Sequence, residues 1–475
     1  MSALSVLRRN AARSLLPAFM LAALLTGGAS LEGEFAKAAL FVASGLLLGC
    51  LFLFSHSWAK GAAASVLAIC VPTILVLIVQ IVPLPVRVTE NLPLRSDALT
   101  ALNALGIKPS ALPISLERDA TFAGIVAFLA PLAGFCLVAA IKWSRGASLL
   151  KWIIPLLGGA GALMGLAQVL IGKEAPWLYL HEFTSRDLPV GVFANPNHQA
   201  SFLLMCLPFI AVLASEIRRD WEGHDEDVVR ATITAVLGLM ILAGVFGAGS
   251  AAGYILLAPV LLFSLVLFLG GGRKGKGKGK GSSLIGMAAL PLVLGFAALV
   301  VFTSPRLTGL GQTSFEDGPA SRIGINRVSA RMIEENWVWG TGLGSYEDVF
   351  RLYEDPGTVS STYIAHAHND YFEWVIETGI AGTVLLAVFL AWWMFHFVRL
   401  WLNTKAEAWR LRRAAAIACL VPVLHSLVDY PLRTPAIAVL AAICLALMVV
   451  VRARPETPLP KDEAVGAEEL RVVTL

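Results

Sequence analysis

The sequence predicts an all-α integral membrane protein with about 12 transmembrane helices and one long extracytoplasmic loop between the ninth and tenth helices. Its 475 residues are 57% hydrophobic and only 15% charged, with a mean hydropathy of +0.73. A soluble chain of this size would carry more charge and fewer long apolar runs. Crossing the hydrocarbon core as a helix takes about 20 apolar residues, and roughly 12 stretches qualify. They centre near residues 14–31, 36–56, 62–83, 121–141, 151–171, 199–215, 230–248, 251–270, 284–303, 379–398, 411–428 and 434–451.

The first apolar stretch is predicted to be a permanent span, because no small-residue cleavage site leads from it into a soluble domain. Placing the N-terminus in the cytoplasm puts most of the Lys and Arg residues on that side, as the positive-inside tendency requires. The loops at 84–119, 173–198 and 304–372 then lie outside the cytoplasm. The longest of them gathers most of the candidate chemistry on one side of the bilayer.

A run of glycines and basic residues from Gly270 to Lys280 separates the eighth and ninth spans. It lacks the spacing of a phosphate-binding loop and no strand precedes it. We interpret it as a disordered cytoplasmic linker beside anionic lipid. The net charge of +4 is therefore a topology signal and gives no reason to expect nucleic acid. Residues 1–452 are predicted to form one polytopic membrane domain, and residues 453–475 a disordered cytoplasmic tail.

All six cysteines lie inside apolar stretches, and none is spaced as a metal site. Because none lies in an extracytoplasmic loop, we expect no disulfide. The eight histidines are scattered without a zinc motif. Candidate chemistry is therefore sought in the polar segments outside the cytoplasm.

The loop before the sixth span ends in Asn195-Pro196-Asn197. Proline fixes φ and asparagine caps helices, so this tripeptide is a turn signal before a helix. One interpretation stops there. The other adds that the two amides and the imidazole of His198, which follows them, are donors at the membrane surface, suited to a sugar or a phosphate.

In the long loop, Arg322, Arg327 and Arg331 follow one another at roughly helical spacing, with apolar residues between them. Such a helix would lie along the membrane interface with a basic stripe. The arginines would then either snorkel to lipid headgroups or hold a diphosphate through paired charge-assisted hydrogen bonds.

The segment from His366 through His368, Asn369 and Asp370 to Tyr371 is the most informative feature of this loop. Two histidines at i, i+2 suit a metal only if a third ligand is near, and none is obvious. A histidine beside an acceptor hydroxyl is better suited to general-base work. We expect Asn369 or Asp370 to orient it.

The end of the span near 411–428 carries His425, and Asp429 follows one helical turn later. Charged groups at the end of a span are costly unless they are paired or face a wet cavity. The pair therefore either locks the helix end or supports the site.

Five segments occur in a fixed order: Gly191 to Asn197, Arg322 before Met332, Gly340 to Tyr346, His366 to Gly382, and His425 to Pro435. Together they resemble the O-antigen ligase and O-antigen polymerase family of bacterial envelope polysaccharide enzymes, over about 190–445. The resemblance implies a C-type glycosyltransferase-like bundle of about a dozen helices. It also implies a periplasmic active face and no metal or other cofactor.

The donor implied by this resemblance is a glycan on undecaprenyl diphosphate. His368 matches the family's key histidine, and Arg322 matches a loop arginine that engages the diphosphate. We expect seven further residues to bind substrate: Asn195, Asn197, Arg327, His366, Asn369, His425 and Asp429.

One position departs from the family pattern. A Ser-Arg pair usually opens the span that begins here near 251, but in this chain Ser250 is followed by Ala251. Either Arg327 or another loop arginine supplies the missing charge, or the donor is handled differently, or catalysis has been lost.

The function expected is transfer of the lipid-linked glycan to an acceptor hydroxyl at the inner membrane. Lipid A core, a second glycan and a protein hydroxyl stay open as acceptors, and membrane lipids are the remaining partners. A small-anion transporter is one alternative, although transporters usually place polar groups near the bilayer midplane. A non-catalytic scaffold for polysaccharide assembly is the other.

Overall fold

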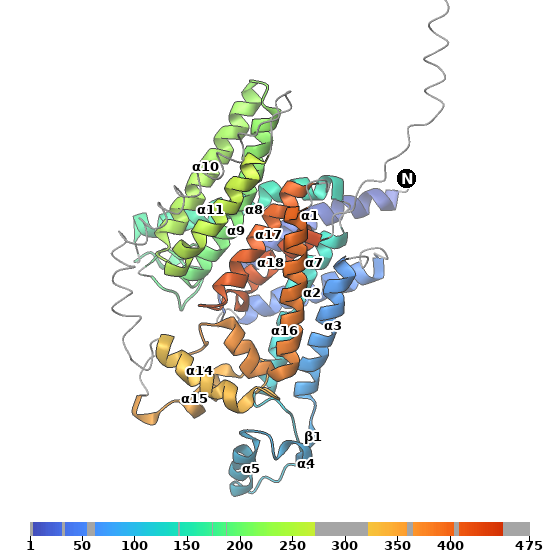
Figure 1. Ribbon diagram of the computed structural model, residues 1–475, viewed down its shortest axis with the longest axis vertical. Helices are drawn as coiled ribbons and strands as arrows, with labels where there is room; N and C mark the ends of the chain where they lie inside the picture. The colour runs from blue at the N-terminus through green and yellow to red at the C-terminus, as the bar shows by residue number, and fades with distance from the viewer. Residues whose placement is uncertain are drawn as a thin grey trace, which may run out of the picture.

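The computed structural model describes residues 3–449 apart from 31–33, 55–61, 141–142, 173, 187, 271–321, 359–363 and 403–407. This part of the chain is mostly helical (Figure 1). The strands found in it, β1 (Leu84–Pro85) and β2 (Ala111–Leu112), form one short antiparallel pair in the loop 84–119. The predicted all-α class is therefore confirmed for the described residues.

Eight helical segments among the described residues are long and apolar enough to cross a membrane. They are α2 (Glu34–Phe54), α3 (Ala62–Ile81), the pair α6 (Arg118–Ala127) and α7 (Leu129–Ala140), α8 (Trp143–Ile171), α9 (Pro196–Asp220), α10 (Asp225–Gly247), α11 (Ala251–Leu269) and α16 (Asp370–Leu402). Three shorter or less apolar helices coincide with the other described predicted spans: α1 (Ala3–Thr26), α17 (Trp409–His425) and α18 (Pro435–Val449). The chain is a multi-pass membrane protein.

Three predictions fall wholly or mostly on residues that the structure does not describe. The predicted ninth span, 284–303, and the predicted cytoplasmic tail, 453–475, both lie outside the described ranges. The Gly270–Lys280 linker also lies outside them beyond its first residue. The total of about 12 spans and the topology built on it stay predictions.

Helix α9 lies at the centre of the bundle. The apolar part of its span is 78% buried, and it packs against α8, α10, α11 and α17. A helix that is apolar around its whole circumference is expected in such a central position. Helix α17 packs against it and carries the small side chains of Ala414, Ala415 and Ala416, all fully buried.

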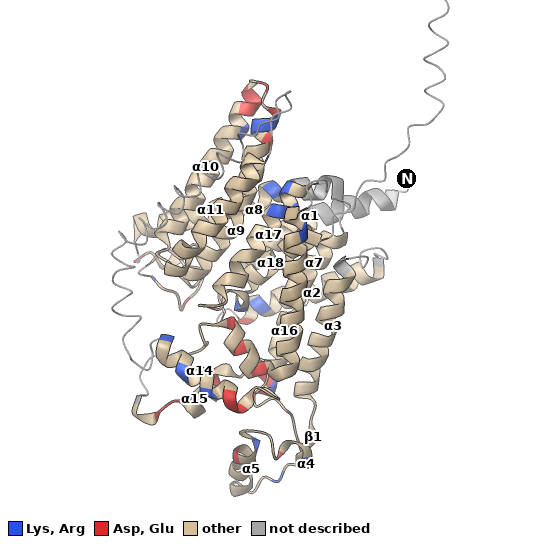
Figure 2. Cartoon of the chain, in the orientation of Figure 1, with Lys and Arg blue, Asp and Glu red and all other residues tan. Residues whose placement is uncertain are grey.

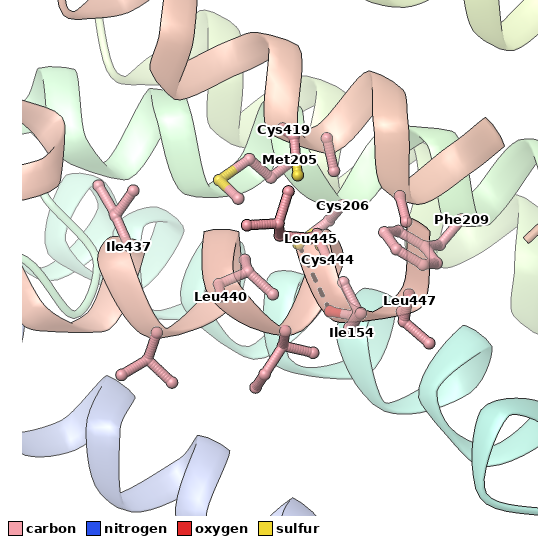
Figure 3. Packing of buried hydrophobic residues seen from close by; sticks show 14 of the residues in the cluster. Ile154, Met205, Cys206, Phe209, Cys419, Ile437, Leu440, Cys444, Leu445 and Leu447 are labelled. Carbon is pink, nitrogen blue, oxygen red and sulfur yellow. Dashed lines mark hydrogen bonds between the residues drawn. The ribbon is translucent and has the colours of Figure 1, made fainter. Parts of the chain in front are cut away.

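The interior between α9, α17 and α18 is a closely packed apolar core (Figure 3). Cys206, Cys419 and Cys444 are buried there with free thiols, as expected for cysteines inside predicted spans. The Cys206 thiol donates to the Ile154 carbonyl at 3.4 Å. A polar site is therefore to be sought at the ends of the helices.

The segment 304–372 is not a plain loop. Its described part contains α14 (Arg322–Asn336) and α15 (Tyr346–Tyr353), and the helical spacing expected for the arginines is confirmed. The apolar faces of both helices share one cluster, which includes Ile325, Met332 and Phe350. These two helices lie across one end of the bundle, with α4 (Val86–Thr89) and α5 (Arg95–Ala104) at the same end (Figure 1).

Helix α16 changes direction at Gly379, whose φ of 63° lies in the left-handed region. A Cβ added there would lie 2.6 Å from the Val338 carbonyl oxygen and 2.7 Å from the Gly340 nitrogen. The turn after α14 passes this close because Ile380 N donates to Val338 O at 3.2 Å and Thr341 N to Ile376 O at 2.9 Å. The bend places the first turns of α16 against α14 and α15.

Charged side chains gather at the two ends of the bundle, with a long uncharged region between them (Figure 2). At the end that carries α14 and α15, Glu373 and Glu377 of α16 are buried, whereas the arginines of α14 are exposed. This distribution is what a membrane-spanning bundle with two wet ends requires.

Candidate functional site

Asn195 and Asn197 lie at the start of α9, where the turn signal placed them. Asn195 is the N-cap residue, and its side-chain oxygen accepts a hydrogen bond from the Asn197 backbone N–H at 2.8 Å. Pro196 occupies the first helical position, where a missing N–H costs nothing. The capping role leaves the Asn197 side chain available for another partner.

That partner is Asp429, a fully buried carboxylate at which several predicted site residues meet. Its Oδ2 accepts from Asn197 Nδ2 at 2.5 Å and lies 3.9 Å from His425 Nε2. Its Oδ1 lies 3.4 Å from His368 Nδ1 and accepts from the Tyr430 backbone N–H at 3.0 Å. Burial raises the pKa of the Asp429 carboxyl, but His368 and the other imidazoles outweigh burial and hold this pKa well below its ordinary value.

His368 presents its Nδ1 edge to Asp429, while 32% of its side chain is exposed. Its φ of 48° is unusual for a residue with a side chain. The next residue anchors this conformation, because the Asn369 side chain caps α16 by accepting from Tyr371 N at 3.0 Å and Phe372 N at 3.1 Å. Its Nδ2 donates to the Leu427 carbonyl at 3.1 Å. Two helix ends thus fix the histidine.

This geometry corrects the expectation that Asn369 or Asp370 orients His368. Asn369 caps the helix, and Asp370 turns away to accept from Ser426 Oγ at 2.7 Å and to face Arg433 at 3.6 Å. Asp429 takes the orienting position instead. The prediction chose the residues next to His368 in sequence. In the first turn of α16, however, successive side chains point about 100° apart, so these neighbours face other partners.

His366 belongs to a second pair of imidazole and carboxylate. Its Nδ1 lies 2.9 Å from Glu373 Oε1, and Glu373 Oε2 accepts from the Ala367 backbone N–H at 3.0 Å. The ring of His366 packs on the ring of Tyr430, with centroids 4.2 Å apart, and the ring of His368 lies 5.1 Å from the same ring. Both imidazoles thus contact the ring of Tyr430.

Arg433 holds the acidic face of α16 in place. Its guanidinium donates to Glu377 Oε2 at 2.7 Å and lies 3.4 Å from Glu373 Oε1 and 3.6 Å from Asp370 Oδ1. Burial lowers the pKa of Arg433, but the three carboxylates outweigh burial and raise this pKa above its ordinary value. Glu377 Oε1 also accepts from Gly344 N at 2.8 Å. Since three carboxylates already surround it, Arg433 is not a free cation for a phosphate.

Arg322, the first residue of α14, is exposed and close enough to Tyr430 for its charge to act there. Burial raises the pKa of the Tyr430 hydroxyl and Asp429 raises it further, whereas a hydrogen bond with Asn195 and the charge of Arg322 lower it. The net pKa lies above its ordinary value. This arginine therefore sits beside the cluster, at a helix N-terminus, an end that favours anions.

Arg327 and Arg331 follow along the exposed side of α14. The charge of Arg331 acts on Tyr353, whose pKa is raised to about 12 by burial and by its hydrogen bond to Glu335. That tyrosine belongs to the contact between α14 and α15. The substrate-binding role expected for Arg327 stays a prediction.

His425, the last residue of α17, is fully buried and its Nδ1 pairs with Ser201 Oγ. One turn earlier on α9, His198 pairs through Nδ1 with Thr434 Oγ1 at 2.9 Å, and its ring meets Tyr430 edge-on at 5.2 Å. His425 thus connects the end of α17 to α9 and also lies beside Asp429.

Sequence reasoning did not assign roles to Tyr430, Arg433 or Glu373. A signal for part of this set was present: Asp370, Glu373 and Glu377 recur at i, i+3 and i+7, which is one face of a helix. Their single counter-charge lies in a different loop and could not be read from that spacing.

The departure at the start of α11 is visible in the structure. Ser250 caps this helix, its Oγ accepting from Gly253 N at 3.0 Å. A Cβ added at Gly253 would lie 2.9 Å from Ala200 Cβ, so α11 begins against the first turns of α9. Position 251 is thus near the site, and the chain places an alanine there.

No group of three His, Cys, Asp or Glu side chains within the described ranges has the geometry to hold a metal ion. The carboxylates of the cluster instead lie beside imidazoles and the guanidinium of Arg433. The chemistry available here is proton transfer and hydrogen bonding by imidazole, with an arginine beside it.

A comparison with protein families matches residues 235–387 to the O-antigen ligase family model. The match covers about a third of the chain and shows that this stretch is similar to O-antigen ligases. The resemblance seen in the motifs is thereby confirmed over a stretch that includes Arg322, His366 and His368. Asn197 and Asp429 lie outside the matched stretch, and the fold brings them to the same site. No curated protein matches the chain.

Proposed function

We propose that this protein is a metal-independent glycosyltransferase of the O-antigen ligase or polymerase type. It moves a glycan from undecaprenyl diphosphate to an acceptor hydroxyl during assembly of cell-envelope polysaccharide. The observation that carries the proposal is the pair of His368 and Asp429, 3.4 Å apart and close to Arg322, of which His368 and Arg322 lie within the stretch that matches the family. A buried carboxylate that orients a partly exposed imidazole is a recurring arrangement for a general base.

His368 takes the proton of the acceptor hydroxyl as its oxygen attacks the anomeric carbon of the donor sugar. The new carbon–oxygen bond forms while the bond from that carbon to the diphosphate breaks. The diphosphate leaves with the bonding electron pair, and configuration at the carbon inverts. Asp429 stabilises the imidazolium that forms, as a carboxylate facing Nδ1 does.

Arg322 stabilises the negative charge that develops on the leaving diphosphate. Preorganised cations at the position where charge develops usually supply the largest electrostatic contribution to catalysis. An exposed guanidinium on the first turn of α14 suits a headgroup that arrives from the membrane surface. Because position 251 is an alanine, Arg322 stabilises the diphosphate without a cation from α11. Arg327 is the second arginine that we assign to the diphosphate.

The polyprenyl chain of the donor would stay in the bilayer beside the helices, with its diphosphate at their wet end. On the predicted topology this end is periplasmic and the membrane is the bacterial inner membrane. Lipid A core, a second lipid-linked glycan and a protein hydroxyl are all compatible with a hydroxyl acceptor at His368.

The proposal is tested with full-length purified protein and the lipid-linked glycan and acceptor extracts of its own host. Release of undecaprenyl diphosphate and formation of the glycosylated product are followed for wild type, His368→Ala and Arg322→Ala. We expect equal amounts of both products from wild type and at least a roughly hundredfold loss in each variant. Arg351→Ala, an exposed arginine on α15, is the matched control and should keep full activity.

An inactive wild type with native donor and acceptor would overturn the proposal. A small-anion transporter or a scaffold for polysaccharide assembly would then explain the fold better. Variants as active as wild type would instead contradict the assignment of His368 and Arg322 while leaving the reaction itself in place.

A further inference from the structure

One ring nitrogen of His366 is engaged and the other has no partner within the described part of the chain. Nδ1 lies 2.9 Å from Glu373 Oε1, whereas Nε2 is buried and makes no hydrogen bond to a described residue. The side chain is only 11% exposed. A buried polar nitrogen without a partner is costly, so its persistence points to a ligand atom that completes it.

Glu373 determines which nitrogen of His366 carries hydrogen. It lies 3.4 Å from the guanidinium of Arg433 and accepts from the Ala367 N–H at 3.0 Å, the surroundings of an ionised carboxylate. An ionised carboxylate only accepts hydrogen bonds, so Nδ1 of His366 must be the donor. In the neutral ring, Nε2 is then an acceptor, which suits the hydrogen of a hydroxyl.

The ligand at this nitrogen is better described as a hydroxyl than as a phosphate. Three carboxylates, Asp370, Glu373 and Glu377, surround the single guanidinium of Arg433. The local charge is therefore negative, and an anionic oxygen beside it would be repelled. A neutral hydroxyl meets no such repulsion.

His366 and His368 flank one ring, that of Tyr430, at centroid distances of 4.2 and 5.1 Å. Each imidazole is oriented through Nδ1 by its own buried carboxylate, Glu373 or Asp429. Two imidazoles packed against one ring fit a molecule that carries several hydroxyls. A sugar has them, whereas a serine or threonine side chain has only one.

We propose that His366 determines acceptor specificity by accepting a hydrogen bond from a second hydroxyl of an acceptor sugar. This second hydroxyl lies on the same sugar as the one that His368 deprotonates. The inference rests on the proposed glycosyl transfer and narrows its acceptor to a sugar that carries several hydroxyls. Glu373 and Arg433 are positioning residues for His366 in this arrangement.

The test uses full-length protein, the host's lipid-linked glycan and defined acceptors. These are methyl glucoside and methyl galactoside, each of their monodeoxy forms, and N-acetylthreonine amide. The ratio kcat/KM for release of undecaprenyl diphosphate is measured above the rate without acceptor. With wild type, we expect a glycoside to be used, the threonine amide not, and one deoxy form to react roughly tenfold or more slowly than its parent.

His366→Ala should lower kcat/KM for the intact glycoside and should no longer distinguish it from that deoxy form. Glu373→Gln should act in the same direction, because an amide can donate to Nδ1 and reverse the roles of the two nitrogens. His224→Ala removes a histidine that is 72% exposed between α9 and α10, and should keep the discrimination of wild type. Thermal unfolding of each variant separates loss of folding from loss of specificity.

Three results would overturn the inference while leaving the proposed reaction standing. One is a His366→Ala variant that discriminates against the deoxy sugar as wild type does. The second is a threonine amide used as well as the glycosides. The third is a wild type that works with host acceptor extract and with none of the glycosides. A wild type inactive in every arm, host extract included, would overturn the proposed function and this inference with it.

Discussion

Arg413 and Arg433 lie near opposite ends of the bundle, and their guanidinium groups are satisfied in different ways. Arg413 donates to the backbone carbonyls of Leu400 at 3.0 Å and Trp401 at 2.9 Å, and it packs over the Trp401 ring at 4.8 Å. Arg433 is held by the carboxylates of three side chains on α16. The first arrangement closes a helix C-terminus with a cation, as many helices do.

The difference shows which end of the molecule transmits a change. A carbonyl keeps its position when the cation beside it is lost, because the helix holds it. A carboxylate released from Arg433 is free to move, and Glu373 is also the partner of His366. A substitution of Arg433 should therefore change the candidate site, whereas a substitution of Arg413 should change only its own surroundings.

The largest effect is expected for Arg433→Met. The substitution leaves three carboxylates buried together without a cation, a situation that typically costs about 3–5 kcal/mol. We expect a marked fall in the unfolding temperature of the purified protein in detergent and loss of glycosyl transfer. Arg351→Met, which removes an exposed arginine paired with Glu347, should leave both unchanged. Wild-type stability in Arg433→Met would contradict the coupling described here.

Asp429→Asn should give the next largest effect, on activity rather than on folding. An amide keeps the shape of the side chain but cannot stabilise an imidazolium, so transfer should fall about a hundredfold, close to 2.7 kcal/mol. Single-turnover release of undecaprenyl diphosphate measures this loss. Full activity in the folded variant would show that His368 works without its carboxylate.

The pH dependence of wild type sharpens the same prediction. The pKa of Asp429 is below its ordinary value in the folded protein, so its stabilising contribution is fully present above about pH 4 and is lost only as pH falls further. An activity decrease between about pH 5 and 8 therefore belongs to a histidine and not to this carboxylate. The acid limb should move in position-368 variants that keep some activity.

Gly379→Ala should have a smaller effect. The backbone there has φ 63° and ψ −159°, a combination almost restricted to glycine, and the added Cβ would approach the Val338 carbonyl. The strain should cost about 1–3 kcal/mol and should shift the turn against which α16 packs. Thermal unfolding of Gly379→Ala, compared with Gly106→Ala at an open loop position that also has positive φ, isolates the crowding from the backbone strain.

The smallest effect is expected at the opposite end, for Arg413→Ala. Loss of its contacts with the Trp401 ring and two carbonyls should cost about 1 kcal/mol, and transfer should keep its wild-type rate. A large loss of activity in a folded Arg413→Ala protein would break the contrast between the two ends.

Much of the fold could be predicted because an apolar stretch of about 20 residues is long enough to cross a membrane as a helix, so hydropathy alone locates it. The helix bearing Arg322 and Arg331 and the cap at Asn195 also followed from local spacing. The pairing of His368 with Asp429 did not, because the two residues lie on different helices, far apart in the chain. Periodicity shows which residues share a face, but not which distant face they meet.

The bend at Gly379 was equally hidden. A glycine inside an apolar run is compatible with an unbroken helix, and only the close approach of the turn after α14 reveals why it is needed. Helix α15 in the segment 304–372 was not predicted, for a related reason. Polar helices such as α14 and α15 are stabilised by packing against one another and against α16, which hydropathy does not register.

The most direct test of the account compares two histidines from the two ends of the bundle. His368→Ala and His224→Ala are purified, their folding is verified by thermal unfolding, and release of undecaprenyl diphosphate from the host's lipid-linked glycan is measured. The account predicts a loss of at least roughly a hundredfold for His368→Ala and a wild-type rate for His224→Ala. Equal rates in the two folded variants would contradict the claim that the end of the bundle with α14 and α15 performs the chemistry.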